Sequence, residues 1–194
     1  ALSAAEILRL YHLGATTKIN TTLTSNPNNA SGLVGHWTFD GPKMLSNVAD
    51  SSGNSNTGYL IGQTSTTTAI GRVGQALSFD GINDNVTVSN SIAGVQSIAF
   101  WMKTSSSTTD VLALTASAST TVVSNAISTA GITSPTVYVD GAVATAIDAG
   151  WHHVVITTAT PITADAITIG KARTFFLGTL DDVRLYNRAL SAAE

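Results

Sequence analysis

The stretch SIAFWMK, residues 97–103, decides the fold class, because its residues favour β-structure and follow the two-residue period of a strand. Similar stretches recur along the chain, and clusters of Gly, Asn, Asp and Ser separate them at the spacing of antiparallel strands. The other predicted strands are LVGHWTF (33–39), TGYLI (57–61), QALSFD (75–80), NVTVS (85–89), VLALTA (111–116), TTVVS (120–124), TVYVD (136–140), AVATAI (142–147), HHVVITTA (152–159), AITIGK (166–171) and LGTLDDVRLYN (177–187). We therefore predict an all-β, two-sheet antiparallel sandwich over residues 32–194.

Composition narrows the function. Only 11% of the 194 residues are charged and the net charge is −3, so there is no basic surface for nucleic acid. No apolar run reaches the roughly 18–20 residues needed to span a bilayer, so we expect no membrane span. The chain has no cysteine, which excludes disulfides and thiolate metal sites. The polar residues are mainly Thr, Ser and Asn, and we expect an extracellular location on a bacterial cell surface.

The first 14 residues, ALSAAEILRLYHLG, predict one short α-helix. Ser3 and Glu6 form a capping box, and Leu2 and Ile7 are placed to pack together across it. Gly14 is a typical helix end. The apolar flank of this helix consists of Ile7, Leu8, Leu10, Tyr11 and Leu13. A helix this short is marginal alone, so its apolar flank needs a surface to cover.

Residues 15–31 form a Thr- and Asn-rich linker. One interpretation is an extended tether, and another is a strand donated to a neighbouring unit. The linker leads into the predicted sandwich at residue 32.

The opening six residues, ALSAAE, recur at residues 189–194. Ser191 and Glu194 repeat the capping box and Leu190 repeats the place of Leu2, but no helix body follows them in this sequence. We expect the helix of residues 1–14 to complete a preceding unit, so that copies join head to tail. Three arrangements fit: tandem units in one polypeptide, separate subunits that exchange the helix, or a helix that packs on its own sandwich.

Several motifs, in order, resemble the laminin-G-like jelly roll of the concanavalin A-like lectin/glucanase superfamily. They are GLVGHWTFDG (32–41), DSSGNSNTG (50–58), GRVGQALSFDGINDNVTV (71–88), SIAFWMK (97–103), YVDG (138–141), WHHVVIT (151–157) and GTLDDVRLYNRALSAAE (178–194). The resemblance covers about residues 32–194. It implies two curved antiparallel sheets packed face to face and a short helix after the last strand.

The chain departs from this family in two places. YVDG precedes WHHV, whereas many relatives have the opposite order. Residues 104–134 are rich in Ser, Thr and Ala and lack the aromatic residues that build a sugar platform. The aromatic residues left as a candidate ligand surface are Tyr59, Tyr138, Phe175 and Phe176.

One structural Ca²⁺ is a candidate cofactor. Hard cations prefer carboxylates, Asn side chains and carbonyls from loops. The loops of this chain supply Asp40, Asp50, Asn54, Asp181 and Asp182, and similar positions in laminin-G-like jelly rolls often hold one Ca²⁺. The alternative is that these residues only stabilise tight turns.

Catalysis is the least expected function. Glycosidases need paired carboxylates, usually Glu, but the only glutamates here are Glu6 and Glu194 in the repeated motif. Asp181 and Asp182 are adjacent and should point to opposite faces of a strand. We therefore expect a non-catalytic structural repeat unit of an extracellular filament or surface array, whose partners are copies of itself. A carbohydrate-binding adhesion module is the alternative, and a glycoside hydrolase is a remote third.

Overall fold

The computed structural model describes residues 31–41, 46–62, 68–191 and 194, and residues Leu33–Glu194 form a compact unit of their own. The predicted helix of residues 1–14 lies outside the described residues, as does the predicted linker except for its last residue. Every regular element of the described part is a β-strand, and this part contains no helix long and apolar enough to cross a membrane.

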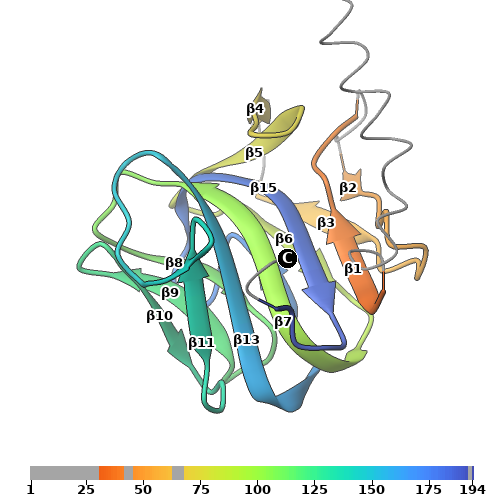
Figure 1. Ribbon diagram of the computed structural model, residues 1–194. Coiled ribbons are helices and arrows are strands. Elements are labelled where there is room, and N and C mark those ends of the chain that lie inside the picture. The colour runs from red at the N-terminus through yellow and green to blue at the C-terminus, as the bar shows by residue number, and fades with distance from the viewer. Residues whose placement is uncertain (1–30, 42–45, 63–67, 192–193) are drawn as a thin grey trace, which may run out of the picture. The chain divides into compact units, whose positions relative to one another are not determined.

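The strands form two antiparallel sheets that face each other, as Figure 1 shows. The larger sheet has the order β12-β11-β13-β7-β15-β5-β4, with β1 paired to β15. Its strands are β1 (Leu33–Trp37), β4 (Thr68–Ile70), β5 (Gln75–Asp80), β7 (Ile92–Lys103), β11 (Thr136–Val139), β12 (Ala142–Val143), β13 (Trp151–Ala164) and β15 (Leu177–Tyr186). This confirms the predicted two-sheet sandwich.

The smaller sheet has the order β10-β9-β8-β14-β6-β3-β2. Its strands are β2 (Asn47–Val48), β3 (Gly58–Ile61), β6 (Asn85–Val88), β8 (Thr108–Ala113), β9 (Ser119–Val123), β10 (Ala126–Ala130) and β14 (Ile167–Ile169). Some strands that are neighbours in this sheet are far apart in the sequence; for example, β14 pairs with both β6 and β8.

Alternating side chains of β7 divide between the core and the outer face of the larger sheet. Ile98, Phe100 and Met102 are buried in the core between the sheets. Ala99 and Trp101 therefore point to the outer face. The burial of the inward set explains why SIAFWMK reads so clearly as a strand.

The tryptophans divide in the same way. The apolar neighbours of Trp37, Trp101 and Trp151 within their strands predict core positions for all three, and Trp37 does lie in the core, at 0% exposure. Its indole N–H donates to the carbonyl of Asn56 at 2.9 Å. Trp101 and Trp151 are only half-buried, so the prediction was wrong for these two. For Trp101 the reason is its outward position on β7.

A β-bulge interrupts the last long strand, β15, where its register against β7 shifts between Asp181 and Arg184. Asp182 has a φ of 52°, in the left-handed region. Leu180 and Val183 both remain in the core. The bulge inserts one residue between them, so both aspartates contact groups of the outer face. Strict alternation, which would send them to opposite faces, does not hold here.

Candidate functional site

The outer face of the larger sheet carries an apolar strip that crosses three strands. Val155 on β13 pairs with Tyr138 on β11 and with Ala99 on β7. Ala99 and Val155 form a small cluster with Tyr186 and Leu190, separate from the main core. The strip therefore lies on the side of the sheet that faces away from the sandwich core.

The segment after β15 folds back onto this strip. The hydroxyl of Ser97 donates to the carbonyl of Arg188 at 2.8 Å, and it accepts the N–H of Leu190 at 2.9 Å. Leu190 is only 8% exposed and packs in the apolar cluster. Figure 1 shows the C-terminal end in front of β7. The second copy of ALSAAE is therefore anchored through its leucine.

The residues after Leu190 form one half of a capping box. The N–H of Ser191 donates to Oε2 of Glu194 at 3.1 Å, as the N-cap N–H does at a helix start. The Ser191 hydroxyl also donates to Oε2, at 2.9 Å. The guanidinium of Arg188 lies 2.6 Å from Oε1, and this contact is the main reason that the pKa of Glu194 falls to about 2.

A second group of outer-face residues surrounds the bulge of β15. Asp181 is 0% exposed, and its Oδ2 accepts the backbone N–H groups of Arg72 and Val73 at 2.7 and 2.8 Å. Its Oδ1 is buried and has no hydrogen-bond partner. Burial raises the pKa of Asp181 to about 6, with smaller contributions from the charges of Asp182 and Asp40.

Asp182 has the opposite electrostatic environment. Its Oδ1 lies 2.6 Å from Nε2 of His36, and its Oδ2 lies 2.7 Å from the guanidinium of Arg184. Burial alone would raise the pKa of Asp182, but these two partners outweigh it and hold the pKa below its usual value. Two neighbouring aspartates therefore differ in kind, since one carboxylate is fully paired and the other keeps a free buried oxygen.

The remaining predicted metal ligands lie in turns. Asp50 accepts the N–H groups of His36, Ser52 and Asn56 and the Ser52 hydroxyl, so both oxygens are occupied. The amide nitrogen of Asn54 donates to the carbonyl of Leu33 and to the Ser52 hydroxyl. Both residues organise the loop of residues 49–56. The described residues contain no group of three or more His, Asp or Glu side chains that could hold a metal ion.

Asp40 is exposed and faces the same turn as Asp181. Its Oδ1 accepts the N–H of Gln75 at 2.7 Å, so the turn of residues 71–75 donates to both carboxylates. Of the five predicted ligands, Asp50, Asn54 and Asp182 are committed to other partners and do not fit a cation. Asp181 keeps one buried oxygen without a hydrogen-bond partner and shares the turn of residues 71–75 with Asp40, so these two carboxylates are the ones that remain as candidates.

The predicted aromatic ligand surface is not one surface. Phe176 is 0% exposed and packs edge-on against Phe79, so its assignment to a ligand surface was wrong. Tyr59 lies on β3 of the smaller sheet, whereas Tyr138 lies on β11 of the larger one. Phe175 lies under the ammonium of Lys171, 4.6 Å from the ring centre.

Trp101 lies on the outer face, although the sequence did not identify it as part of a candidate ligand surface. The guanidinium of Arg72 lies 5.0 Å from its ring centre, and the ring of His153 lies 4.9 Å away. The sequence also gave no direct signal for Ser97 or His36 as partners of the last strand and segment. These roles depend on pairing between residues that are far apart in the chain, which one sequence does not reveal.

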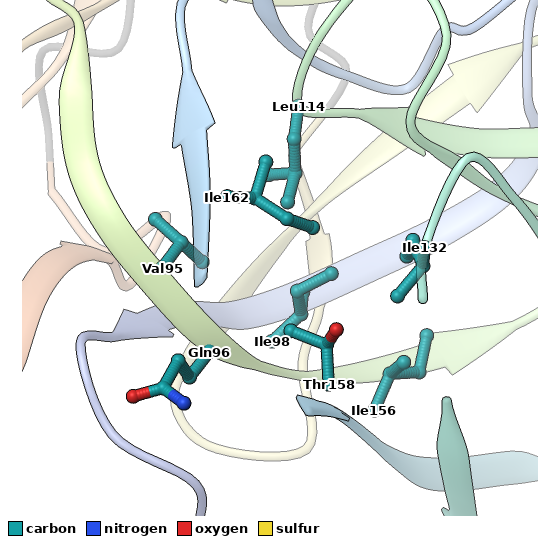
Figure 2. Close-up of a pocket in the computed structure, with 8 residues that line it drawn as sticks. All are labelled: Val95, Gln96, Ile98, Leu114, Ile132, Ile156, Thr158 and Ile162. Carbon is teal, nitrogen blue, oxygen red and sulfur yellow. The ribbon is translucent and has the colours of Figure 1, made fainter. Parts of the chain in front are cut away.

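A small gap lies beside the irregular pairing of β7 and β13. Its empty volume is about 160 Å³, which includes space open to solvent, and Figure 2 shows its largely apolar lining. Its lining residues are Val95, Gln96, Ile98, Leu114, Ile132, Ile156, Thr158 and Ile162. This lining offers no carboxylate and no ring of polar groups, so it does not resemble a sugar or catalytic cleft.

The fold and these sites define a β-sandwich module of the jelly-roll class. A sequence model of the concanavalin A-like lectin/glucanases superfamily, of laminin-G type, matches residues 64–194. The chain belongs to this superfamily. No curated protein matches the chain.

Proposed function

We propose that this chain is a non-catalytic structural unit of an extracellular array, joined to the next copy through the helix that follows ALSAAE. Its superfamily fits a structural or lectin-like module. Among the residues that the structure describes, the one glutamate is Glu194, which forms an ion pair with Arg188. The proposal therefore assigns the chain a mechanical role.

One observation carries the proposal. The second copy of ALSAAE is held on the outer face by Leu190, and Ser191 and Glu194 already have the contacts of a helix start. In the first copy the same six residues continue into ILRLYHLG, residues 7–14. Such a continuation after Glu194 would begin its helix against the sandwich of the unit before it.

The test is hydrogen exchange on a polypeptide of two periods, in which residues 7–194 follow Glu194. The junction between the two periods is called the seam. The backbone amides of residues 7–14 that follow Glu194 at the seam should exchange at least about tenfold more slowly than those of the same residues at the start of the chain. Equal exchange at both places would contradict the proposal. Melting of the single chain provides the reference for a folded sandwich.

Carbohydrate binding is a second candidate, favoured by the half-exposed Trp101 on the outer face. The ring is a stacking surface of the kind that sugars use, although Arg72 and His153 flank it. Screening against a glycan array tests this candidate. Binding that is lost in Trp101→Ala and kept in Tyr59→Ala would support it.

Calcium binding is a further part of the proposal, with Asp40 and Asp181 as the ligands. Their support is the free buried Oδ1 of Asp181 and the charge of Asp40, which contributes to the raised pKa of Asp181. Bound Ca²⁺ would neutralise both carboxylates and stabilise the turn of residues 71–75. The melting temperature should then fall by several degrees when EDTA is added in excess, and Asp181→Asn should abolish this shift. A melting temperature that does not change on adding EDTA would contradict Ca²⁺ binding.

A further inference from the structure

A short strap joins the two sheets at the side of the sandwich where β10 and β11 lie in Figure 1. The strap is defined as residues 144–148, which follow β12 at the edge of the larger sheet. They pass beside β10, the edge strand of the smaller sheet. The N–H of Ile127 donates to the carbonyl of Thr145 at 2.7 Å, and the N–H of Ile147 donates to the carbonyl of Asn125 at 3.0 Å. The strap therefore covers the start of the outer edge of β10.

The strap is less buried than the strands that it joins. Ala144 and Ile147 pack against the main core but remain half-buried, and the other three strap residues are exposed. An isolated bridge between Ala146 and Ala126 links the strap to β10. Segments with little buried apolar surface open at a lower free-energy cost than core strands. The groups that hold the end of the strap therefore influence how often it opens.

His152, near the start of β13, holds the end of the strap through both ring nitrogens. Its Nε2 lies 3.0 Å from Oδ1 of Asp148, the last strap residue, and its Nδ1 lies 2.7 Å from Oδ2 of Asp140 in the turn after β11. The other oxygen of Asp140 accepts the backbone N–H of His153 at 2.9 Å, which fixes this carboxylate in place. The three side chains of His152, Asp140 and Asp148 are called the clasp.

The contacts of the clasp depend on the protons of the imidazole. In a neutral ring protonated at Nδ1, this nitrogen donates to Asp140, and Nε2 accepts the backbone N–H of Asp148, 3.0 Å away. A second proton, on Nε2, allows a charged hydrogen bond to the carboxylate of Asp148 instead. The charged ring therefore binds two carboxylates, whereas the neutral ring binds one.

The charged groups that face His152 are the two carboxylates of the clasp. On β7, Met102 lies opposite His152, and the exposed Lys103 belongs to the other face of the sheet. His153 also points to that other face, where it lies against the ring of Trp101. The residues of β10 carry no charge. The state of the imidazole is therefore set mainly by the clasp itself.

The two carboxylates favour the charged imidazole. Burial lowers the pKa of His152, but the hydrogen bonds and charges of Asp140 and Asp148 outweigh it, so the pKa is raised above its usual value. The pKa of each carboxyl is lowered, because the hydrogen bonds that both accept favour the ionised form. Both carboxylates therefore stay ionised while the imidazole titrates.

We propose that the clasp is a proton-dependent closure of the strap, which holds it tightly when His152 is charged and loosely when His152 is neutral. The folded chain binds this proton more tightly than the unfolded chain, in which the pKa is about 6.5. The contribution of the clasp is therefore complete below that value and is lost as the pH rises through the folded pKa. Opening of the strap uncovers the edge of β10. This inference does not depend on how copies of the chain are linked.

Hydrogen exchange of the whole chain at pH 5.5 and 8.5, resolved by residue with NMR, tests the proposal. The reporters are the amides of Ile127 and Ile147, which donate across the contact between the strap and β10. After correction for intrinsic exchange rates, their protection should be about twofold to fivefold lower at pH 8.5, as expected for the loss of a partly exposed ion pair. Equal protection at the two pH values would overturn the proposal.

Two variants assign the effect to the clasp. Asp148→Asn removes the charge that binds the protonated Nε2, so it should abolish most of the pH-dependent fall and lower the pKa of His152 in an NMR titration. The matched control is Asp165→Asn, an exposed position that follows the other end of β13, and it should leave both results unchanged. A fall of the same size in Asp148→Asn and in the unmodified chain would assign it to another group and contradict the clasp.

Discussion

The residues at the two ends of the outer face of the larger sheet differ in whether the chain supplies their contacts. At the apolar end, Leu190 folds back and buries its side chain beside Ala99 and Val155. At the carboxylate end, Asp181 is buried with one oxygen that accepts no hydrogen bond. The first end has its contacts supplied by the chain itself. At the second end, a buried carboxylate oxygen has no hydrogen-bond partner, so it favours a bound cation or proton. The two ends therefore differ in chemistry: one is a packing surface and the other is a site for positive charge.

The largest expected effect is at the carboxylate end. Asp181→Ala would leave the N–H groups of Arg72 and Val73 without their acceptor, and should lower the free energy of unfolding by about 3 kcal/mol. Asp40→Ala is the matched control, because Asp40 is exposed and accepts one N–H from Gln75, and should cost about 1 kcal/mol or less. Urea denaturation compares the two. Equal costs would mean that Asp181 is no special feature of this end.

The apolar end should respond to loss of its anchor. Leu190→Ala removes a side chain that is 8% exposed, and should cost about 2 kcal/mol. Leu177→Ala is the control, since Leu177 is 45% exposed and its loss should cost less than about 1 kcal/mol. Thermal and urea unfolding give both values. A Leu190→Ala chain as stable as the control would show that the segment after β15 does not seal the strip.

The two ends should also differ in pH dependence. The pKa of Asp181 is raised to about 6 in the folded chain, above its value in the unfolded chain, so the folded state holds the proton more tightly. Its contribution to stability is complete below about pH 4 and is lost as the pH rises through 6, a loss of about 2 kcal/mol. Urea denaturation from pH 4 to 7, with EDTA present, should show this loss. It should be absent in Asp181→Asn, and persistence of the loss there would assign it to another group.

The smallest expected effect is at the capping contacts. The pKa of Glu194 is lowered to about 2, so its contribution is present above about pH 4 and is lost as the pH falls towards 2. Its ion pair with Arg188 is partly exposed, so Glu194→Gln should cost less than about 1 kcal/mol at pH 7. The contribution of Glu194 to the free energy of unfolding therefore rises with pH, whereas that of Asp181 falls. A cost that grows at low pH would contradict this assignment.

The sequence predicted the sandwich because its signal is local. In SIAFWMK the inward residues alternate with outward ones, and this period is visible without the partner strands. The same rule failed for Asp181 and Asp182, since a bulge shifts the register between them and no residue pattern announces it. It also failed for Trp101, because alternation alone does not say which set of residues faces the core.

The candidate site was less predictable than the fold. Five oxygen ligands were expected together, but Asp50 is used to close its own loop and Asp182 binds His36 and Arg184. The sequence offers the ligand types but not their competitors, since each competitor is brought in by strand pairing or by a turn. The repeated ALSAAE differs, because identity between two segments is visible in the sequence itself. The anchoring of Leu190 adds the surface on which its second copy lies.

Hydrogen exchange at the junction between the two periods of the two-period polypeptide is the direct test of a helix that joins one copy to the next. We expect residues 7–14 after the internal ALSAAE to be protected at least about tenfold more than the same residues at the start of the chain. The protection should fall when Leu190 of the first unit is replaced by Ala, because the anchor of the motif is then lost. Equal and rapid exchange at both positions would contradict the claim that this module is joined to the next through the helix.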